Sequence, residues 1–371
     1  MYITDYMNIN KLNASGRGAI PRGWGVQILL AMLLVISGSC KQQTESEVRN
    51  VILDVDTSVD DIMSILYLLQ DPGITIRAIT ISNGVAPADS GLEIVLRLLN
   101  LTGHTDIPVA RGALYPLKGN NSFPLQWQPS VSRPFGLILP PHASKASNDS
   151  AGSIIIKMLE KYKGNIDILA LGPMTNIAGV FLSNPSLVGN VNQVLVSDGA
   201  VYVEGGIFTE YPAVNNRVSG WNLWVDPLAA DVVFRSGADV ILVPLDITAM
   251  HGRDPLLLTR VMAEKYKAHA AGIIGKSMAD LMNNWVKSYQ YMGLPGDSLK
   301  GVPIWDLVAC MVYRHPEIAL EWQEKNIRVR EGDVEVAGQI VVNGSDKPVA
   351  RIVLKGNQAL LDSLLLETAG R

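Results

Sequence analysis

From residue 51 onward, short apolar segments rich in β-branched residues alternate with amphipathic segments of helical spacing. The expected strands are 51–55, 74–81, 166–170, 191–196 and 240–243, and the expected helices between them are 62–69, 92–99, 154–162 and 176–182. This alternation predicts an α/β fold, in which an open, mostly parallel sheet is flanked by helices. Towards the end of the chain, 327–330, 334–342 and 350–354 are predicted to be antiparallel strands, followed by a terminal helix at 359–368.

The first forty residues have a different character from the rest of the chain. A weakly basic segment precedes an uncharged apolar run at 26–36, which ends in small residues before Cys40. This order predicts a signal peptide at 1–39, and the small residues resemble the lipid-attachment signal of bacterial lipoproteins. A signal anchor, or an ordinary signal peptide with an incidental cysteine, is the alternative. We expect a polar tether at 40–50, one domain at 51–371, and an exported protein anchored by lipid at Cys40.

Composition excludes several classes of protein. The 371 residues carry 31 basic and 35 acidic side chains, which gives no electrostatic basis for binding nucleic acid. The chain has only two cysteines, too few for a disulfide scaffold or a cysteine-rich zinc site. No nucleic-acid partner is therefore expected, and contact with a membrane is expected only through the amino terminus.

A cluster of acids follows the first expected strand. Its members, within eight residues, are Asp54, Asp56, Asp60 and Asp61. In open α/β sheets, ligands gather at the carboxyl ends of the strands, and carboxylates crowded there repel one another unless a cation lies between them. Oxygen ligands favour Ca²⁺ or Mg²⁺ over zinc. The alternative, acids that favour a helix amino terminus, accounts only for Asp60 and Asp61.

Four segments of the chain resemble a known enzyme family. Segment 53–61 alone fits loosely the haloacid-dehalogenase phosphatases, but it is more similar to the first signature of the nucleoside hydrolases (inosine-uridine-preferring family). Segments 169–178, 221–230 and 302–306 resemble the later signatures of the same family, in the family's order. The resemblance covers about residues 51–315 and implies the nucleoside-hydrolase fold with a Rossmann-like core.

The resemblance implies a calcium site and a catalytic base. Its implied ligands are the carboxylates of Asp56, Asp60, Asp61 and Asp306 and the backbone carbonyl of Leu171. Asp54 would support the site from behind, and Asp56 would take the proton of the attacking water. The implied reaction is hydrolysis of the N-glycosidic bond of a ribonucleoside to free base and ribose.

The same resemblance assigns residues to the base and the sugar. Trp305 stands just before Asp306, as in the purine-preferring inosine-adenosine-guanosine branch, where two tryptophans sandwich the base. Trp127 resembles the second tryptophan, Asp89 an aspartate near the base, and Asn222 a sugar ligand. Ordinary core packing is the alternative for both tryptophans. A purine-leaning enzyme is the expectation.

Two positions depart from the family's pattern. Gly220 stands where the family usually has an acid, and Gly206 where it commonly has an asparagine, and both of those side chains would contact the ribose. Glu210, Asn215 and Asn216 are the candidates to replace these contacts. Two alternatives to the main expectation follow: a hydrolase of an unusual riboside, or a catalytically impaired lipoprotein that binds calcium and a sugar or nucleoside. Association into homo-oligomers is left open.

Overall fold

The computed structural model describes residues 48–291, 301–343 and 349–371. The predicted signal peptide, most of the predicted tether and Cys40 lie outside these residues. Strand β1 begins at Arg49, so the domain starts two residues inside the segment predicted to be a tether. In the part of the chain that the structure describes, no helix is both long and apolar enough to cross a membrane.

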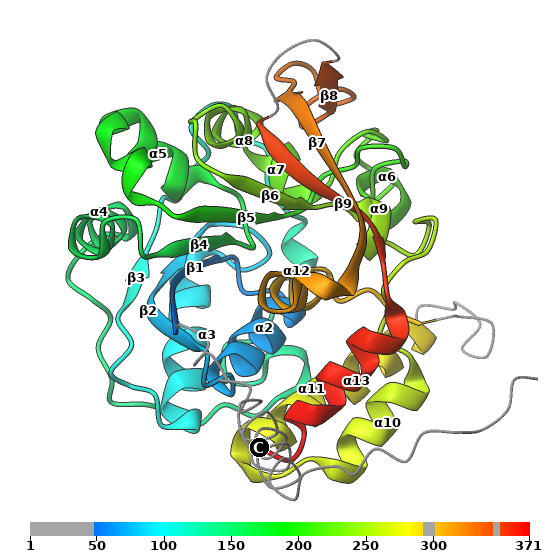
Figure 1. The fold of residues 1–371 in the computed structure, drawn as a ribbon. Coiled ribbons are helices and arrows are strands. Elements are labelled where there is room, and N and C mark those ends of the chain that lie inside the picture. The colour runs from blue at the N-terminus through cyan, green and yellow to red at the C-terminus, as the bar shows by residue number, and fades with distance from the viewer. Residues whose placement is uncertain (1–47, 292–300, 344–348) are drawn as a thin grey trace, which may run out of the picture. The chain divides into compact units, whose positions relative to one another are not determined.

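One nine-stranded sheet organises the domain, with strand order β3-β2-β1-β4-β5-β6-β9-β7-β8 (Figure 1). The strands are β1 (Arg49–Val55), β2 (Ile74–Ile81), β3 (Val109–Arg111), β4 (Asp167–Ala170), β5 (Gln193–Ser197), β6 (Val240–Val243), β7 (Ala319–Val329), β8 (Ile340–Asn343) and β9 (Ala350–Gly356). Strands β1 to β6 and β9 run parallel, and β7 is antiparallel to both β8 and β9. The predicted open, mostly parallel sheet is confirmed.

Helices cover both faces of the sheet (Figure 1). The longer ones are α2 (Val59–Leu69), α3 (Ala88–Thr102), α4 (Ala151–Tyr162), α5 (Thr175–Ser183), α8 (Pro227–Phe234), α10 (Arg260–His269), α11 (Gly272–Tyr291), α12 (Trp305–Arg314) and α13 (Gln358–Thr368). The short ones are α6 (Ile207–Glu210), α7 (Trp221–Val225) and α9 (Leu245–Thr248). One apolar core includes side chains of α2, α3, α11 and α12, and a second core on the other face includes those of α4, α5 and α8.

Strand β1 shows why the sheet lies inside the protein. Val51, Leu53 and Val55 belong to the first core, whereas Ile52 belongs to the second. Side chains of a strand alternate between faces, so an unbroken apolar run is buried on both sides, as in parallel sheets. β1 pairs with β2 on one side and with β4 on the other. Successive strands are added on one side of β1 up to β3 and on its other side from β4 onward, and ligands of open α/β sheets bind where the strand order switches in this way.

The carboxy-terminal strands differ from the prediction. Only the end of the expected strand 334–342 forms β8, because 333–338 forms a turn instead. The strand expected at 350–354 joins β6 in parallel pairing as well as β7 in antiparallel pairing. Local sequence predicts extended segments, but it does not determine which neighbour a strand will find.

The segment 112–150 is largely irregular, with two short 3₁₀ turns, η1 (Leu125–Trp127) and η2 (Pro134–Gly136). It is fixed by polar contacts to distant elements: Leu117 N donates to Asp226 at 2.7 Å, and Asn121 donates to the carbonyl of Trp224 at 2.7 Å. The excursion is thereby fastened beside α7.

Candidate active site

Three elements bring the predicted carboxylates together at the carboxyl edge of the sheet. Asp56 directly follows β1, and Asp60 and Asp61 lie in the first turn of α2. The hydroxyl of Ser58 caps that helix, and the carboxylate of Asp61 accepts from the backbone N of Ser58 in return. Asp306 lies in the first turn of α12, where its backbone N donates to Asp60 Oδ2 at 2.9 Å. Two helix amino termini therefore face one acidic cluster.

The backbone between Asp56 and α2 is strained. Thr57 has a φ of 68°, the left-handed region that a β-branched residue rarely adopts. Its hydroxyl is buried without a hydrogen-bond partner. Strain of this kind persists where the surrounding structure holds it in place, and it is concentrated at functional sites.

Close approach of the chain fixes the Asp56 side chain. Asp56 Oδ2 accepts from the backbone N of Val85 at 3.0 Å, and a Cβ atom on Gly84 would lie 2.0 Å from that same oxygen. Only a glycine at 84 leaves room for this carboxylate.

The four carboxylates are buried, and the pKa of each is raised. Burial is the largest cause throughout; it raises the pKa of Asp56 to about 6, and that of Asp60 above its usual value. The pKa values of Asp61 and Asp306 are raised well above their usual range, by burial and then by the charges of their acidic neighbours. Protons or a cation must offset this repulsion.

The cluster suits a hard cation in its donor set. Its side-chain ligands are all oxygens, which Ca²⁺ prefers, and Asp61 Oδ1 is buried with no hydrogen-bond partner. In the described parts of the chain, however, no three histidine, cysteine, aspartate or glutamate side chains are arranged ready to hold a metal ion. Asp60 instead accepts a hydrogen bond from the Ser58 hydroxyl. Binding a cation therefore requires these side chains to turn towards a common point, and the ligand set stays a prediction.

The remaining residues predicted for the calcium site lie beside the cluster. Leu171 immediately follows β4, and its backbone N donates to the carbonyl of Asp54 at 2.9 Å. Asp54 is buried behind the cluster, where Oδ1 accepts from Thr80 at 2.6 Å and from Asn176 at 2.9 Å. Burial raises the pKa of Asp54 to about 7 despite these bonds. Asn222, from α7, donates to the carbonyl of Leu171 at 2.7 Å, which places this predicted sugar ligand next to the site.

The structure does not bring the two predicted base-stacking tryptophans together. Trp127 is half-buried and packs edge-on against Trp221, with ring centroids 4.9 Å apart. Trp305 is also half-buried, and its ring lies 6.5 Å from that of Trp285 in α11. No ring contact in the described residues joins Trp127 to Trp305. Both retain an exposed part, so the sandwich stays a prediction.

Asp89 lies on the surface. Its side chain is 71% exposed and forms an ion pair with Arg111 at 2.9 Å. The described contacts do not connect it to the acidic cluster, and its role near the base stays a prediction.

Sequence reasoning missed one acid of the site, Asp198. It follows the end of β5, and its side chain is close enough to Asp56 for that charge to raise its pKa, which burial raises to about 6. The available signal was its position just after an apolar strand, where the first strand also carries its acids. Of the proposed substitutes, Asn216 instead holds the carbonyls of Val334 and Ala337.

Comparison with known proteins decides the family. The model of the inosine-uridine preferring nucleoside hydrolases matches residues 51–361. The chain belongs to this family. Nucleoside hydrolases cleave N-ribosyl bonds, so this member is an N-ribosyl hydrolase.

Curated relatives of this nucleoside hydrolase include uridine nucleosidase 1 of Arabidopsis thaliana, 29% identical over 73% of this chain and 75% of that protein. The pyrimidine-specific ribonucleoside hydrolase RihA of Escherichia coli is 34% identical over 53% of this chain and 60% of its own length. Among solved structures, a purine-preferring ribonucleoside hydrolase from Gardnerella vaginalis superposes with a TM-score of 0.73 at 25% identity, covering 87% of this chain and 98% of that one.

Proposed function

We propose that this nucleoside hydrolase is a calcium-dependent, purine-leaning enzyme that releases free base and ribose from ribonucleosides. The observation that carries the proposal is the convergence of Asp56, Asp60, Asp61 and Asp306, buried and without a cation partner among the side chains around them. Bound calcium would orient the sugar's vicinal hydroxyls and acidify the attacking water.

Within this proposal, each residue has a distinct task. The cation would be held by the carboxylates of Asp56, Asp60, Asp61 and Asp306 and by the carbonyl of Leu171, and Asp54 would support the site from behind. Asp56 would also take the proton of the attacking water, because its carboxylate is fixed by Val85 and Gly84. Asn222 donates from its amide nitrogen to the carbonyls of Leu171 and Ser197, which would leave its amide oxygen for the sugar.

The purine preference rests on aromatic surface near the start of α12. Trp305 directly precedes Asp306, keeps an exposed part, and is braced by Trp285. Stacking on such a ring favours a large, polarizable base. The relatives differ in this respect, since RihA is named pyrimidine-specific and the Gardnerella enzyme purine-preferring.

We further propose that the enzyme acts outside the cytoplasm, anchored by lipid at Cys40. The signal-like sequence of residues 1–39 supports this. Substituting Cys40→Ser should abolish incorporation of labelled fatty acid into the protein in cells. Labelling that persists in the variant contradicts the anchor.

A panel of purine and pyrimidine nucleosides, each assayed with added calcium for release of free base, tests the activity. We expect release from purine nucleosides at the highest kcat/KM. Calcium binding without base release from any nucleoside would overturn the enzymatic proposal in favour of a binding protein.

Substituting Trp305→Ala should reduce kcat/KM for purine nucleosides more than for activated aryl ribosides, and an equal loss contradicts base stacking.

A further inference from the structure

Two carboxylates occupy the space left by the two glycines that depart from the family's pattern. A Cβ atom built on Gly220 would lie 1.6 Å from Asp198 Oδ1, which is an overlap rather than a contact. A Cβ atom built on Gly206 would lie 2.9 Å from Glu210 Oε1. Each missing side chain is thus matched by an acid that enters the same volume from another position in the chain.

Asp198 is held in this place at a conformational cost. Its φ is 154°, which L residues rarely adopt, and it is 9% exposed. Oδ2 accepts from the backbone N of Leu223 at 2.8 Å, while Oδ1 points at Gly220. A strained, buried acid beside the catalytic cluster is a candidate for a functional residue.

Glu210 faces the same cluster from α6. Its Oε2 accepts from Trp221 Nε1 at 2.7 Å, which fixes the carboxylate beside the neighbour of Asn222. Although the residue as a whole is exposed, the protein packed around its carboxyl group raises its pKa to about 7, and the charges of Asp198 and Asp60 add to this. Asp198 lies against Gly220 and Glu210 bonds the side chain of Trp221, so both acids meet the start of α7, next to Asn222.

We propose that Asp198 and Glu210 form the sugar-binding pair of this enzyme, replacing the side chains that relatives carry at positions 220 and 206. The inference rests on the proposed function. Because calcium would hold the vicinal hydroxyls of the ribose, the hydroxyl left for these acids is the 5′-hydroxyl. An ionised carboxylate only accepts hydrogen bonds, and those from a hydroxyl to it are short and strong.

Asp198 and Glu210 also disfavour a ligand that carries negative charge at its 5′ position. In their ionised form, Asp198 and Glu210 repel a 5′-phosphate, which disfavours a nucleotide relative to a nucleoside. A purely structural role for Asp198, as an acceptor for the first turn of α7, is the competing explanation, and it makes no prediction about the 5′-hydroxyl.

The first experiment uses thermal unfolding to test whether Asp198 fills the space beside Gly220. Gly220→Glu alone should lower Tm strongly, because its Cβ overlaps Asp198. The exchange Asp198→Gly with Gly220→Glu should restore most of that loss, because it moves the acid from one position to the other. A Gly220→Glu protein with unchanged Tm, or an exchange variant no better than Gly220→Glu alone, overturns the spatial replacement.

The second experiment tests sugar recognition by comparing inosine with 5′-deoxyinosine. The unaltered enzyme should prefer inosine in kcat/KM on the order of 10- to 100-fold, the value of one hydrogen bond to a charged group. Asp198→Gly and Glu210→Gln should each reduce this preference, and the Asp198→Gly/Gly220→Glu exchange should recover part of it. Full preference retained in Asp198→Gly would leave only the structural role and overturn the proposal.

A matched control comes from Asp226, another buried acid that accepts from backbone N atoms, those of Leu117 and Ala229. Asp226→Asn should lower Tm while leaving the preference for inosine over 5′-deoxyinosine unchanged. A preference that falls equally in Asp226→Asn shows a nonspecific effect of destabilisation and counts against Asp198.

Failure of the proposed function is separable from failure of this inference. If the unaltered protein hydrolyses neither compound, the calorimetric affinities for inosine and 5′-deoxyinosine in the presence of calcium replace kcat/KM. A higher affinity for inosine that Asp198→Gly removes supports the sugar-binding pair even without catalysis. Absence of nucleoside binding, or equal affinities in the unaltered protein, overturns it.

Discussion

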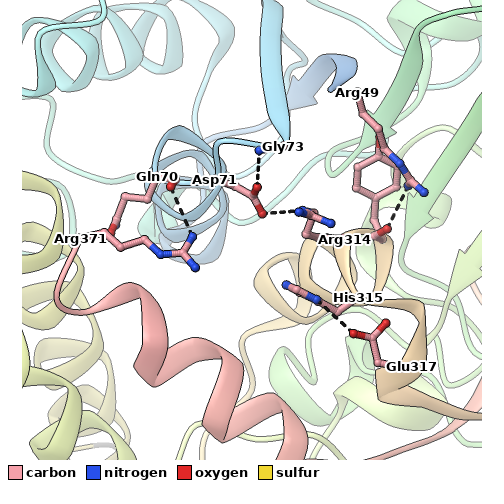
Figure 2. Close-up of polar contacts among 9 residues, drawn as sticks. Arg49, Gln70, Asp71, Gly73, Arg314, His315, Glu317 and Arg371 are labelled. Atoms are coloured by element: carbon pink, nitrogen blue, oxygen red, sulfur yellow. Dashed lines mark hydrogen bonds and ion pairs between the residues drawn. The ribbon is translucent and has the colours of Figure 1, made fainter. Parts of the chain in front are cut away.

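The two ends of one helix pair differ in how their charges are balanced. Helices α2 and α12 pack together, and their amino termini carry Asp60, Asp61 and Asp306, which lack a basic partner among their described contacts. At their other ends, Asp71 follows α2 and Arg314 closes α12, and the two meet in an ion pair of 2.6 Å (Figure 2).

The paired end holds further polar contacts beside this ion pair. Asp71 also accepts from the backbone N of Gly73 at 2.7 Å, and Arg49 donates to the carbonyl of Tyr313 at 3.2 Å (Figure 2). Buried charges in such a setting are satisfied by the protein itself, whereas those at the acidic end await a cation or protons. The ion pair at one end therefore stabilises the fold, whereas the repulsion between carboxylates at the other end is relieved when a ligand binds.

The largest expected effect is on activity, at the acidic end. Asp56→Asn should lower kcat for nucleoside hydrolysis on the order of 10²- to 10⁴-fold, because it removes the proposed general base. The same change should not destabilise the calcium-free protein, since it removes one charge from a repulsive cluster. Enzyme assays and urea unfolding in chelator measure the two effects. A calcium-free variant that is clearly less stable would refute the repulsion.

At the paired end we expect a large effect on stability. Arg314→Met should lower the free energy of unfolding by about 3 kcal/mol, because Asp71 would remain 6% exposed without its partner. The side chain of Arg314 is 26% exposed, which puts the loss at the lower end for buried pairs. Urea unfolding measures it, and KM should not change. A selective loss of activity without loss of stability would break the division between the two ends.

Calcium should stabilise the protein through the acidic end. At a calcium concentration 100 times the Kd, binding to the folded state alone adds about 2.7 kcal/mol to the free energy of unfolding. Thermal unfolding with calcium and with chelator measures this. Asp306→Ala should abolish the difference, whereas Arg314→Met should retain it. Unchanged stabilisation in Asp306→Ala argues against this ligand set.

The stabilisation of the protein by calcium should grow with pH. Burial raises the pKa of Asp54 to about 7 and that of Asp56 to about 6, so the calcium-free folded state holds protons that the unfolded chain has lost. The contribution of these two carboxyl groups to stability without calcium is therefore fully present below about pH 4 and is lost as the pH rises through 6 and 7. Calcium requires the ionised carboxylates, so it should raise Tm more at pH 8 than at pH 5.5. A larger rise in Tm at pH 5.5 than at pH 8 would contradict the raised pKa values.

The smallest effect is expected where an ion pair is exposed. Lys157 and Asp149 meet at 2.7 Å, but their side chains are 59% and 36% exposed. Asp149→Asn should change the free energy of unfolding by less than about 0.5 kcal/mol, because water screens such pairs. A loss near that of Arg314→Met would show that burial does not set the difference between the pairs.

Sequence predicted the parts of this protein that depend on local pattern. The strands 74–81 and 240–243 match β2 and β6, because apolar β-branched runs bounded by turn residues need no distant information. The acids after β1 and at the start of α12 were also identified, through ordered motifs.

What sequence could not provide depends on tertiary contacts. Nothing near Gly220 indicates that Asp198, which follows a strand on the far side of a loop, fills its space. The packing of Trp127 against Trp221 likewise arises from how the segment 112–150 folds back. The parallel pairing of β9 with β6 also depends on contact between segments far apart in the sequence.

Cys310 lies in α12 between the acidic end and the paired end, and it is fully buried. Burial also raises the pKa of its thiol well above the usual range, so little thiolate is present at neutral pH. An alkylating reagent can therefore reach it only when α12 separates from the sheet. The rate at which Cys310 is labelled therefore measures how often that opening occurs. Measured in one unmodified protein, it shows how strongly calcium at the amino terminus of α12 and the Asp71–Arg314 pair at the other end keep the helix packed.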